Sequence, residues 1–423
     1  MSQHQIGNII PEIHIDDYIY DLPEEQIATA PLPERDQSKL LMVQAKTGEI
    51  SHHHFSDLPD LLPAETLLVF NNSKVIAARL ALKKQSGGKV EVLCVEPSEP
   101  NSDIALALLA KGAVKWKCLL HGRNLKALMT LSTSVMHQAK PLLLKATLVE
   151  KGMESTLCFE WQPKELPFLE VLEAVGKAPL PPYLKREPTR SDKLRYQTVY
   201  AKSEGSVAAP TAGLHFTPAV LERLRQKGVS SAELTLHVGM GTFKPVQQSN
   251  VQHHVMHAEQ ISVPKQTLLT LHNHIEKGKP VVAVGTTSMR VLESLYWFGV
   301  KLLLKDNKVL HKSIMNVEQW EAYTLASQLS TLPATVQGLE AVLECLQKHS
   351  LDGLSGKTQL IIVPGYRYMM CDGLITNFHQ PRSTLILLVA AFLGGELWKK
   401  VYNEALQNGY RFLSYGDSSL LWR

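Results

Sequence analysis

The hydrophobic pattern of this chain changes midway, and that change limits the possible folds more than any other feature. From residue 66 to about residue 161, short segments rich in valine and leucine, such as TLLVF, GGKVEVLCV and STLCFEW, follow one another with little helical period. This pattern is typical of a small antiparallel sheet or barrel. After residue 179, strand-like runs alternate with amphipathic helices, which predicts an α/β arrangement.

One helix of the second part has clear start and stop signals. Thr217 can cap it, Pro218 can begin it and Gly228 can end it. VVAV at 281–284 predicts a short strand, followed by the turn GTTS and a helix over 289–299.

These patterns predict an α/β fold: a mixed α/β domain with an inserted small antiparallel β-barrel domain. The α/β catalytic domain is expected over 1–65 and 175–423, and the barrel over 66–174. Residues 301–357 interrupt the alternation with polar and helical sequence and are interpreted as an insertion.

Composition restricts the function only loosely. Lysine and arginine exceed aspartate and glutamate by 44 to 40, so any nucleic-acid surface must be local. Five cysteines without a CxxC pair indicate free thiols in a reduced compartment. The start of the chain lacks the features of a secretory signal, and the apolar run at 385–395 is too short to span a membrane. We expect a cytoplasmic protein without membrane association, as a monomer or weak oligomer.

Two loops are expected where strands end, the usual place for ligands in open α/β sheets. GSVAAPTAGLHF surrounds Thr211, Gly213 and His215 with small residues, so a ligand can approach its backbone; a tightly packed turn is the alternative. VGTTSMR places Thr286 and Thr287 at a helix N-terminus, which favours a carboxylate or phosphate, although an ordinary helix cap also explains it. Neither a Walker lysine nor a dinucleotide glycine pattern is present, which argues against nucleotide hydrolysis and nicotinamide chemistry.

A third loop carries more polar groups, and two histidine clusters suggest a metal. DGLITNFHQPRST brings Asp372, Asn377, His379 and Arg382 to one strand and the loop after it. The run at 52–54 alternates sides if extended, so its three histidines cannot face one ion. His253, His254 and His257 with Glu259 lack the HExxH order of zinc peptidases, so we expect no metal, and a metal-dependent hydrolase stays an alternative.

Taken together, the loops resemble the S-adenosylmethionine:tRNA ribosyltransferase-isomerase family. The matching segments run from near the start to the end of the chain in the family's order. They include DYIYDLPEEQIATAPLPERDQSKLLMV, TLLVFNNSKVIAARL, GSVAAPTAGLHF, LTLHVGMGTFKPV, AVGTTSMRVLES, DGLITNFHQPRSTL and YRFLSYGDSSLL.

The resemblance implies an α/β domain joined to a six-stranded β-barrel. It also implies transfer of the ribosyl group of S-adenosylmethionine onto 7-aminomethyl-7-deazaguanine at the wobble position of tRNA. Epoxyqueuosine forms, and adenine and methionine leave. S-adenosylmethionine is then a co-substrate, and no cofactor is expected. A non-catalytic tRNA-binding homologue is the second alternative.

For this reaction we expect a general base near the 5′ methylene that the sulfonium acidifies, and histidine suits it. His215 or His237 is the expected base, with His379 in reserve, and Asp372 or Asp417 would assist departure of adenine. Thr211, Thr286 and Thr287 are expected to hold the methionine carboxylate or a tRNA phosphate, and Arg290 and Arg382 to add positive charge. Further substrate contacts are expected from Gly213, Asn377, His379 and Asp417.

The tRNA itself is expected at the densest basic run before these loops. Lys185, Arg186 and Arg195 can contact phosphates, and Tyr196 can stack on an unpaired anticodon base; a solvated loop is the alternative.

Overall fold

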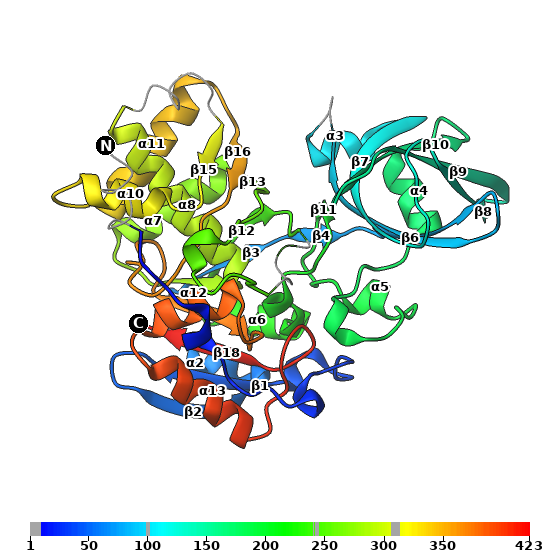
Figure 1. The fold of residues 1–423 in the computed structure, drawn as a ribbon. Helices are drawn as coiled ribbons and strands as arrows, with labels where there is room; N and C mark the ends of the chain where they lie inside the picture. The colour runs from blue at the N-terminus through cyan, green and yellow to red at the C-terminus, as the bar shows by residue number, and fades with distance from the viewer. Residues whose placement is uncertain (1–9, 99–101, 240, 242–244, 306–313) are drawn as a thin grey trace. The chain divides into compact units, whose positions relative to one another are not determined.

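The structure is a computed structural model that describes residues 10–98, 102–239, 241, 245–305 and 314–423. It divides into two compact units (Figure 1). The first comprises the chain up to Asn72, Thr198–Ala201 and Pro210–Arg423, and the second comprises Ser73–Gln197 and Lys202–Ala209. The mixed α/β class with a separate barrel is confirmed.

A mixed ten-stranded sheet runs through the first unit, with four parallel strands at its centre. Two of these, β3 (Leu67–Asn71) and β14 (Val281–Val284), are buried along their whole length because both faces are covered, and they are accordingly mostly apolar. The strands, in spatial order, are β15 (Met315–Val317), β16 (Gly353–Thr358), β13 (Glu259–Pro264), β12 (Ser230–Leu236), β3 (Leu67–Asn71), β14 (Val281–Val284), β17 (Gly373–Asn377), β18 (Ser418–Trp422), β1 (Lys39–Gln44) and β2 (Glu49–His54).

Helices cover both faces of this sheet. One face packs against α2 (Leu58–Leu61) and α6 (Pro218–Gln226). The other receives α8 (Thr286–Leu303), which contacts β3, β12 and β14 and packs on α11 (Thr335–Lys348). The remaining helices are α7 (Lys265–Glu276), α10 (Glu321–Gln328), α12 (Thr384–Leu393) and α13 (Leu397–Gln407), with short 3-10 helices η1 (Ile15–Tyr18), η2 (Glu24–Gln26), η3 (Arg35–Gln37), η4 (Phe55–Asp57), η6 (Thr211–His215) and η8 (Val251–His253).

The second unit is a closed antiparallel barrel. Its strands alternate between inward apolar and outward polar residues, and the ring of Phe168 contacts the rings of Trp116, Phe159 and Trp161. In spatial order the strands are β10 (Ser155–Gln162), β7 (Ala113–His121), β6 (Lys89–Pro97), β5 (Arg79–Lys84), β8 (Thr130–His137) and β9 (Lys140–Glu150). The unit also contains α3 (Ile104–Leu109), α4 (Phe168–Val175), η5 (Pro182–Leu184), α5 (Asp192–Arg195) and the parallel pair β4 (Ser73–Val75) and β11 (Ser203–Ser206).

Two of the expected segments have a different place in the structure. β3 lies within the predicted barrel segment 66–174, but it is a central strand of the large sheet. Its five residues are all buried, which suits a strand covered on both faces. Segment 301–357 supplies α10, α11 and the edge strands β15 and β16, so it is integrated into the first unit; that it is an insertion stays a prediction. No helix among the described residues is long and apolar enough to cross a membrane.

Candidate active site

The carboxyl ends of β12, β3, β14 and β17 meet at one edge of the large sheet, because these four strands are parallel. Asn71 ends β3, Gly285 follows β14, and Asn377 ends β17. His237 directly follows β12. This edge is where an open α/β sheet binds its ligands.

Close contacts bring the predicted loops together at this edge. A β-carbon on Gly285 would lie 3.7 Å from Cβ of Ala212, so η6 approaches the start of α8. The ring of His215 lies 3.1 Å from Oδ1 of Asn377, and Nδ2 of Asn71 donates to Oγ1 of Thr287 over 3.3 Å. The structure therefore gathers Thr211, Gly213 and His215 with Thr286, Thr287 and the end of β17.

His215 is held between a hydroxyl and an amide. Nδ2 of Asn377 donates to the carbonyl of Leu413, which leaves Oδ1 to accept from Nε2–H of His215. Oγ of Ser38 then donates to Nδ1 over 2.7 Å. This hydrogen-bond pattern assigns the neutral tautomer. Burial lowers the pKa of His215 to about 4, although the bond to Asn377 opposes the shift.

His379 is also kept neutral. Burial lowers the pKa of its imidazole to about 3, and its Nε2 lies 2.9 Å from Oγ1 of Thr376. Its backbone N–H donates to the Tyr402 hydroxyl, and its carbonyl accepts from the Tyr20 hydroxyl. A base with so low a pKa is poorly matched to proton transfer near neutral pH.

His237 differs from both in its exposure. It is half-buried, and its backbone N–H donates to the carbonyl of Gln260 over 2.9 Å. The preceding residue, Leu236, exchanges two hydrogen bonds with the side chain of Asn71, which fixes this strand end beside β3. Of the three candidate histidines, His237 is the one that is not fully buried.

A buried ion pair lies one turn into α8. Nη1 of Arg290 pairs with a carboxylate oxygen of Glu259, and Nε donates to the carbonyl of Leu360 over 3.0 Å. The other oxygen of Glu259 accepts from the backbone N–H of Gly239, two residues after His237. The pair therefore joins α8 to the start of β13 and to the end of β12.

Backbone N–H groups donate to both acidic candidates, Asp372 and Asp417. Asp372 precedes β17, at the opposite edge of the sheet, where it accepts from the backbone N–H of Val281. The five-residue strand puts it ~16 Å from Asn377, so the expected catalytic role of Asp372 is corrected. Asp417 lies at the correct edge, but its oxygens accept from the backbone N–H groups of Lys39 and Arg411, which hold it as a brace between segments.

Arg382, on the third loop, also has a structural partner. Its backbone is left-handed, with φ of 59°, and its guanidinium pairs with Asp16. Its carbonyl accepts from the backbone N–H of Val246. Arg382 therefore ties the third loop to neighbouring segments of the first unit.

The residues expected to contact tRNA lie in the barrel unit, and they differ in exposure. Tyr196 is 1% exposed, so its ring cannot stack on a base, and that role is corrected. Arg186 forms two bonds of 2.7 Å with Asp192, which is itself buried. Lys185 is exposed, at a left-handed position, and Arg195 is half-buried.

The histidine clusters have other partners. Glu259, the proposed acidic member of one cluster, is engaged by Arg290. His52 contacts the hydroxyl of Tyr410 and the carboxylate of Glu404. Within the described ranges, no three His, Cys, Asp or Glu side chains are grouped to hold an ion.

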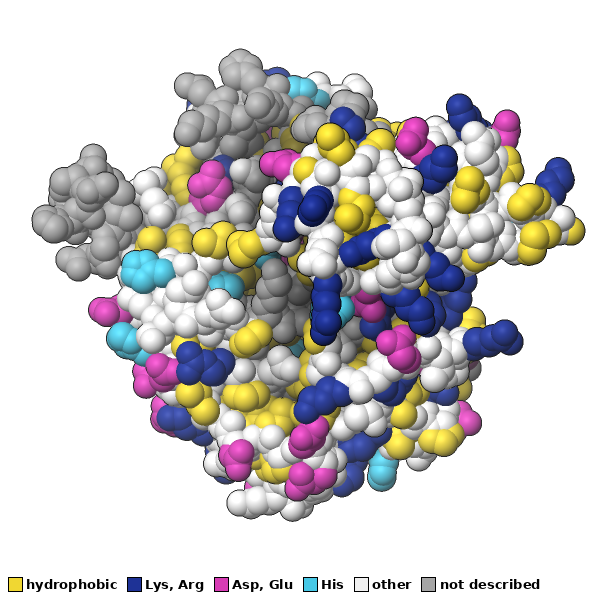
Figure 2. Space-filling view, turned by 45° about the vertical axis from the view of Figure 1, so that its right-hand side comes forward, with side chains coloured by type: hydrophobic (Ala, Val, Ile, Leu, Met, Phe, Trp, Pro, Cys, Tyr) yellow, Lys and Arg dark blue, Asp and Glu magenta, His cyan; other side chains and the backbone are white. Residues whose placement is uncertain are grey.

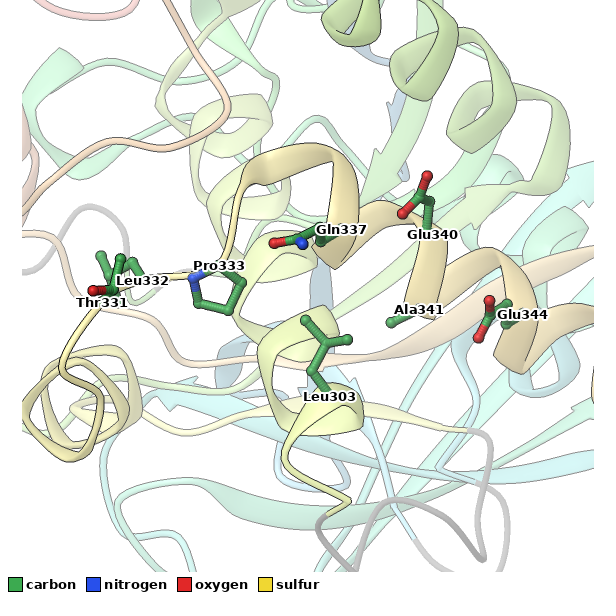
Figure 3. Close-up of a pocket in the computed structure, with 8 residues that line it drawn as sticks. All are labelled: Leu303, Thr331, Leu332, Pro333, Gln337, Glu340, Ala341 and Glu344. Atoms are coloured by element: carbon green, nitrogen blue, oxygen red, sulfur yellow. The ribbon is translucent and has the colours of Figure 1, made fainter.

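A pocket of about 500 Å³ lies at the other end of α8. Figure 3 shows residues that line it. Leu303 lines it together with residues of α11 and the segment before it. Leu303 lies seventeen residues after Thr286, hence ~25 Å along the helix axis. This pocket is separate from the gathered loops.

Sequence reasoning missed two contributors to the site, Ser38 and Asn71, and gave a third, Glu259, a different role. Ser38 orients His215, Asn71 joins β3 to Thr287, and Glu259 holds Arg290. Asn71 could have been found from its position at the end of a buried apolar run. The sequence carries no local signal for the other two contacts, which join residues 177 and 31 positions apart.

Comparison with known proteins shows the family to which the chain is related. The S-adenosylmethionine:tRNA ribosyltransferase-isomerase of Pelobacter propionicus is 38% identical over 96% of this chain and 99% of its own. The enzyme of the same name from Thermotoga maritima is 37% identical over the same shares. A crystal structure of S-adenosylmethionine tRNA ribosyltransferase from Thermotoga maritima is 30% identical, covers 96% of this chain and 99% of that one, and has a TM-score of 0.45. The family model described as queuosine biosynthesis protein matches residues 15–421, and the chain belongs to this family.

Proposed function

We propose that the chain transfers and isomerises the ribosyl group of S-adenosylmethionine onto 7-aminomethyl-7-deazaguanine at the wobble position of tRNA. The products are epoxyqueuosine-tRNA, adenine and methionine. S-adenosylmethionine is the co-substrate, and no bound cofactor takes part. The observation that carries the proposal is the convergence of the family's loop motifs at the carboxyl ends of β3, β12, β14 and β17.

His237 is the proposed general base. The sulfonium makes the 5′ methylene acidic, and removal of its proton would form an ylide that starts the loss of adenine. His237 lies at the ligand-binding edge and is half-buried, whereas His215 and His379 are buried. His215 has both ring nitrogens occupied by Ser38 and Asn377, which favours a positioning role that holds η6 against β17.

The tRNA backbone is proposed to contact the barrel unit. This unit contains 21 lysines and arginines against 13 aspartates and glutamates, a net charge of +8, whereas the whole chain carries only +4. The remainder is therefore net negative by four. Figure 2 shows many Lys and Arg side chains on the surface in view. Such a local excess of positive charge is what a phosphate backbone requires.

Within the barrel unit, one end of the barrel is especially basic. The β5–β6 hairpin carries Lys83, Lys84 and Lys89, and the β7–β8 loop carries Arg123 and Lys126. Nζ of Lys84 donates to the carbonyl of Arg123, which joins the two loops. Lys83 and Lys89 face each other across β5 and β6, and like charges in direct register repel. None of the five forms an ion pair with the described acidic residues, so phosphates would relieve this repulsion.

Nucleoside analysis of substrate tRNA tests the proposal. Wild-type protein, S-adenosylmethionine and tRNA bearing the modified base should yield epoxyqueuosine with one adenine released per product. His237→Ala should lower the rate about 100-fold or more while tRNA affinity is kept, since general base catalysis is typically worth that much. Absence of product with wild-type protein would reject the proposed function. A normal rate in His237→Ala would reject only the assignment of His237 as the general base.

Salt dependence tests the tRNA surface separately. Replacing Lys83 and Lys89 with serine should weaken tRNA binding and reduce the salt slope by about 0.7–0.9 per lost phosphate contact. The matched control is Lys399→Ser, in α13 of the first unit, where the lysine pairs with Glu396. An unchanged slope in the double variant would place the tRNA elsewhere.

A further inference from the structure

The N-terminus of α8 directly follows β14, so it lies at the ligand-binding edge of the sheet. Its cap residue is Gly285, with φ of 90° and no side chain to cap the helix. The backbone N–H of Met289 donates to Gly285, but those of Thr286, Thr287 and Ser288 donate to no acceptor among the described residues. An 18-residue helix with uncapped N–H groups concentrates partial positive charge at this end.

Arg290 adds an independent observation. Its side chain is on the same face of α8 as Thr286 and Thr287, because residues three and four apart are neighbours and helical side chains lean toward the N-terminus. Arg290 is 6% exposed, and its Nη2 has no hydrogen-bond partner among the described residues. A buried donor without a partner costs stability, which a ligand anion would recover.

The guanidinium is fixed before any ligand arrives. Nη1 is paired with Glu259, and Nε donates to the carbonyl of Leu360. Arg290 and Glu259 together carry no net charge, so the attraction for an anion comes from Nη2 and from the helix end. Oγ1 of Thr287 accepts from Asn71, which leaves the Thr287 hydroxyl proton available to donate.

We propose that this end of α8 binds the α-carboxylate of the methionine portion of S-adenosylmethionine. One carboxylate oxygen accepts from Nη2 of Arg290, and the other accepts from the Thr287 hydroxyl and the helix N–H groups. Thr286 and Thr287 are 7% and 8% exposed, which suits the end of a small molecule better than a bulky backbone phosphate. The assignment rests on the proposed function, since it takes S-adenosylmethionine as the ligand.

Equilibrium binding of two ligands to the full chain tests the site. Decarboxylated S-adenosylmethionine keeps the sulfonium and adenosine but lacks the carboxylate. Wild-type protein should bind S-adenosylmethionine about tenfold to a hundredfold more tightly than the decarboxylated form, the usual range for charge-assisted hydrogen bonds. In Arg290→Lys this preference should fall to a few-fold, with the affinity for the decarboxylated ligand nearly unchanged. The lysine keeps a positive partner for Glu259 but offers no second donor arm.

Two further variants guard against misinterpretation. Arg223→Lys, on α6, where the arginine pairs with Asp60, is the matched control and should keep the wild-type preference. The double variant Glu259→Gln/Arg290→Gln removes both buried charges, so it leaves none unpaired, and it should lose the preference as well. Circular dichroism spectra establish that each variant is folded.

Failure of the carboxylate site and failure of the proposed function give different binding results. An equal loss of both affinities in Arg290→Lys, or an unchanged preference, overturns the carboxylate site while the proposed function stands. A loss of tRNA affinity with an unchanged preference also overturns it and assigns the anion to a phosphate. If wild-type protein binds neither ligand, the proposed function fails together with the inference.

Discussion

Replacing His215 with glutamine should flatten the dependence of stability on pH. Burial lowers the pKa of His215 from 6.5 to about 4, so the folded protein takes up this proton only near pH 4, whereas the unfolded chain takes it up near pH 6.5. The unfolded state therefore binds more protons in this window. The free energy of unfolding is unaffected above pH 6.5, falls as the pH is lowered from 6.5 to 4, and loses nothing further from this group below pH 4.

The size of the effect follows from the same shift. One pH unit inside the window is worth about 1.4 kcal/mol per proton, so lowering the pH from 7 to 5 costs the wild-type protein about 2 kcal/mol through His215 alone. His215→Gln should be less stable at pH 7, because two buried hydrogen bonds are altered. Its further loss between pH 7 and pH 5 should nevertheless be about 2 kcal/mol smaller than that of the wild type.

Hydrogen–deuterium exchange in a urea series measures this loss of stability for the first compact unit alone, since peptides from β17 and η6 report on that unit rather than on the barrel. Val220→Ala is the matched control: it removes buried apolar volume from the core beside η6 but no titrating group. It should lower stability equally at both pH values. If His215→Gln loses as much stability between pH 7 and pH 5 as the wild type, the imidazole is not held neutral, and the assigned tautomer is wrong.

Gly299→Ala should lower the melting temperature of the first unit by several degrees, because a β-carbon there would lie 2.2 Å from the carbonyl oxygen of Gly338 on α11; calorimetry that shows no shift would contradict this packing. Glu293→Leu should cost about 2–4 kcal/mol in urea unfolding, since the carboxylate accepts bonds from two backbone N–H groups and the Tyr366 hydroxyl, while Glu293→Gln, which keeps one acceptor, should cost less. Asp192→Ala should release Arg186 and speed tryptic cleavage in the preceding loop, whereas equal cleavage of wild type and variant would mean that the bidentate pair does not order it.

Local signals located several elements accurately. The helix expected from Thr217, Pro218 and Gly228 spans Pro218–Gln226, with Oγ1 of Thr217 accepting from Val220 N–H. The strand expected at 281–284 is β14. These predictions succeeded because caps, prolines and short apolar runs act over a few residues. The helix expected over 289–299 is longer, Thr286–Leu303, because packing against β14 and α11 supports the additional turns.

The candidate site was only partly accessible to the same reasoning. Its loops could be recognised from small and polar residues between strands and helices, and the structure gathers them. The sequence pattern groups Asp372 with Asn377 because both adjoin one strand, but only the end of the strand that carries Asn377 lies at the ligand-binding edge. The basic run beside Tyr196 predicts a stacking role for this residue, but its ring is buried.

The sequence alone determined the order of strands and helices, the separation of an α/β unit from a barrel, and the loops from which a site would be built. These are local properties, written in spacing, turns and caps. Tertiary structure decided which histidine stays accessible, which carboxylate faces the ligand edge and which donor of Arg290 is left over. Those properties depend on desolvation and on partners distant in the chain, such as Ser38, 177 residues before His215, and no local pattern encodes them.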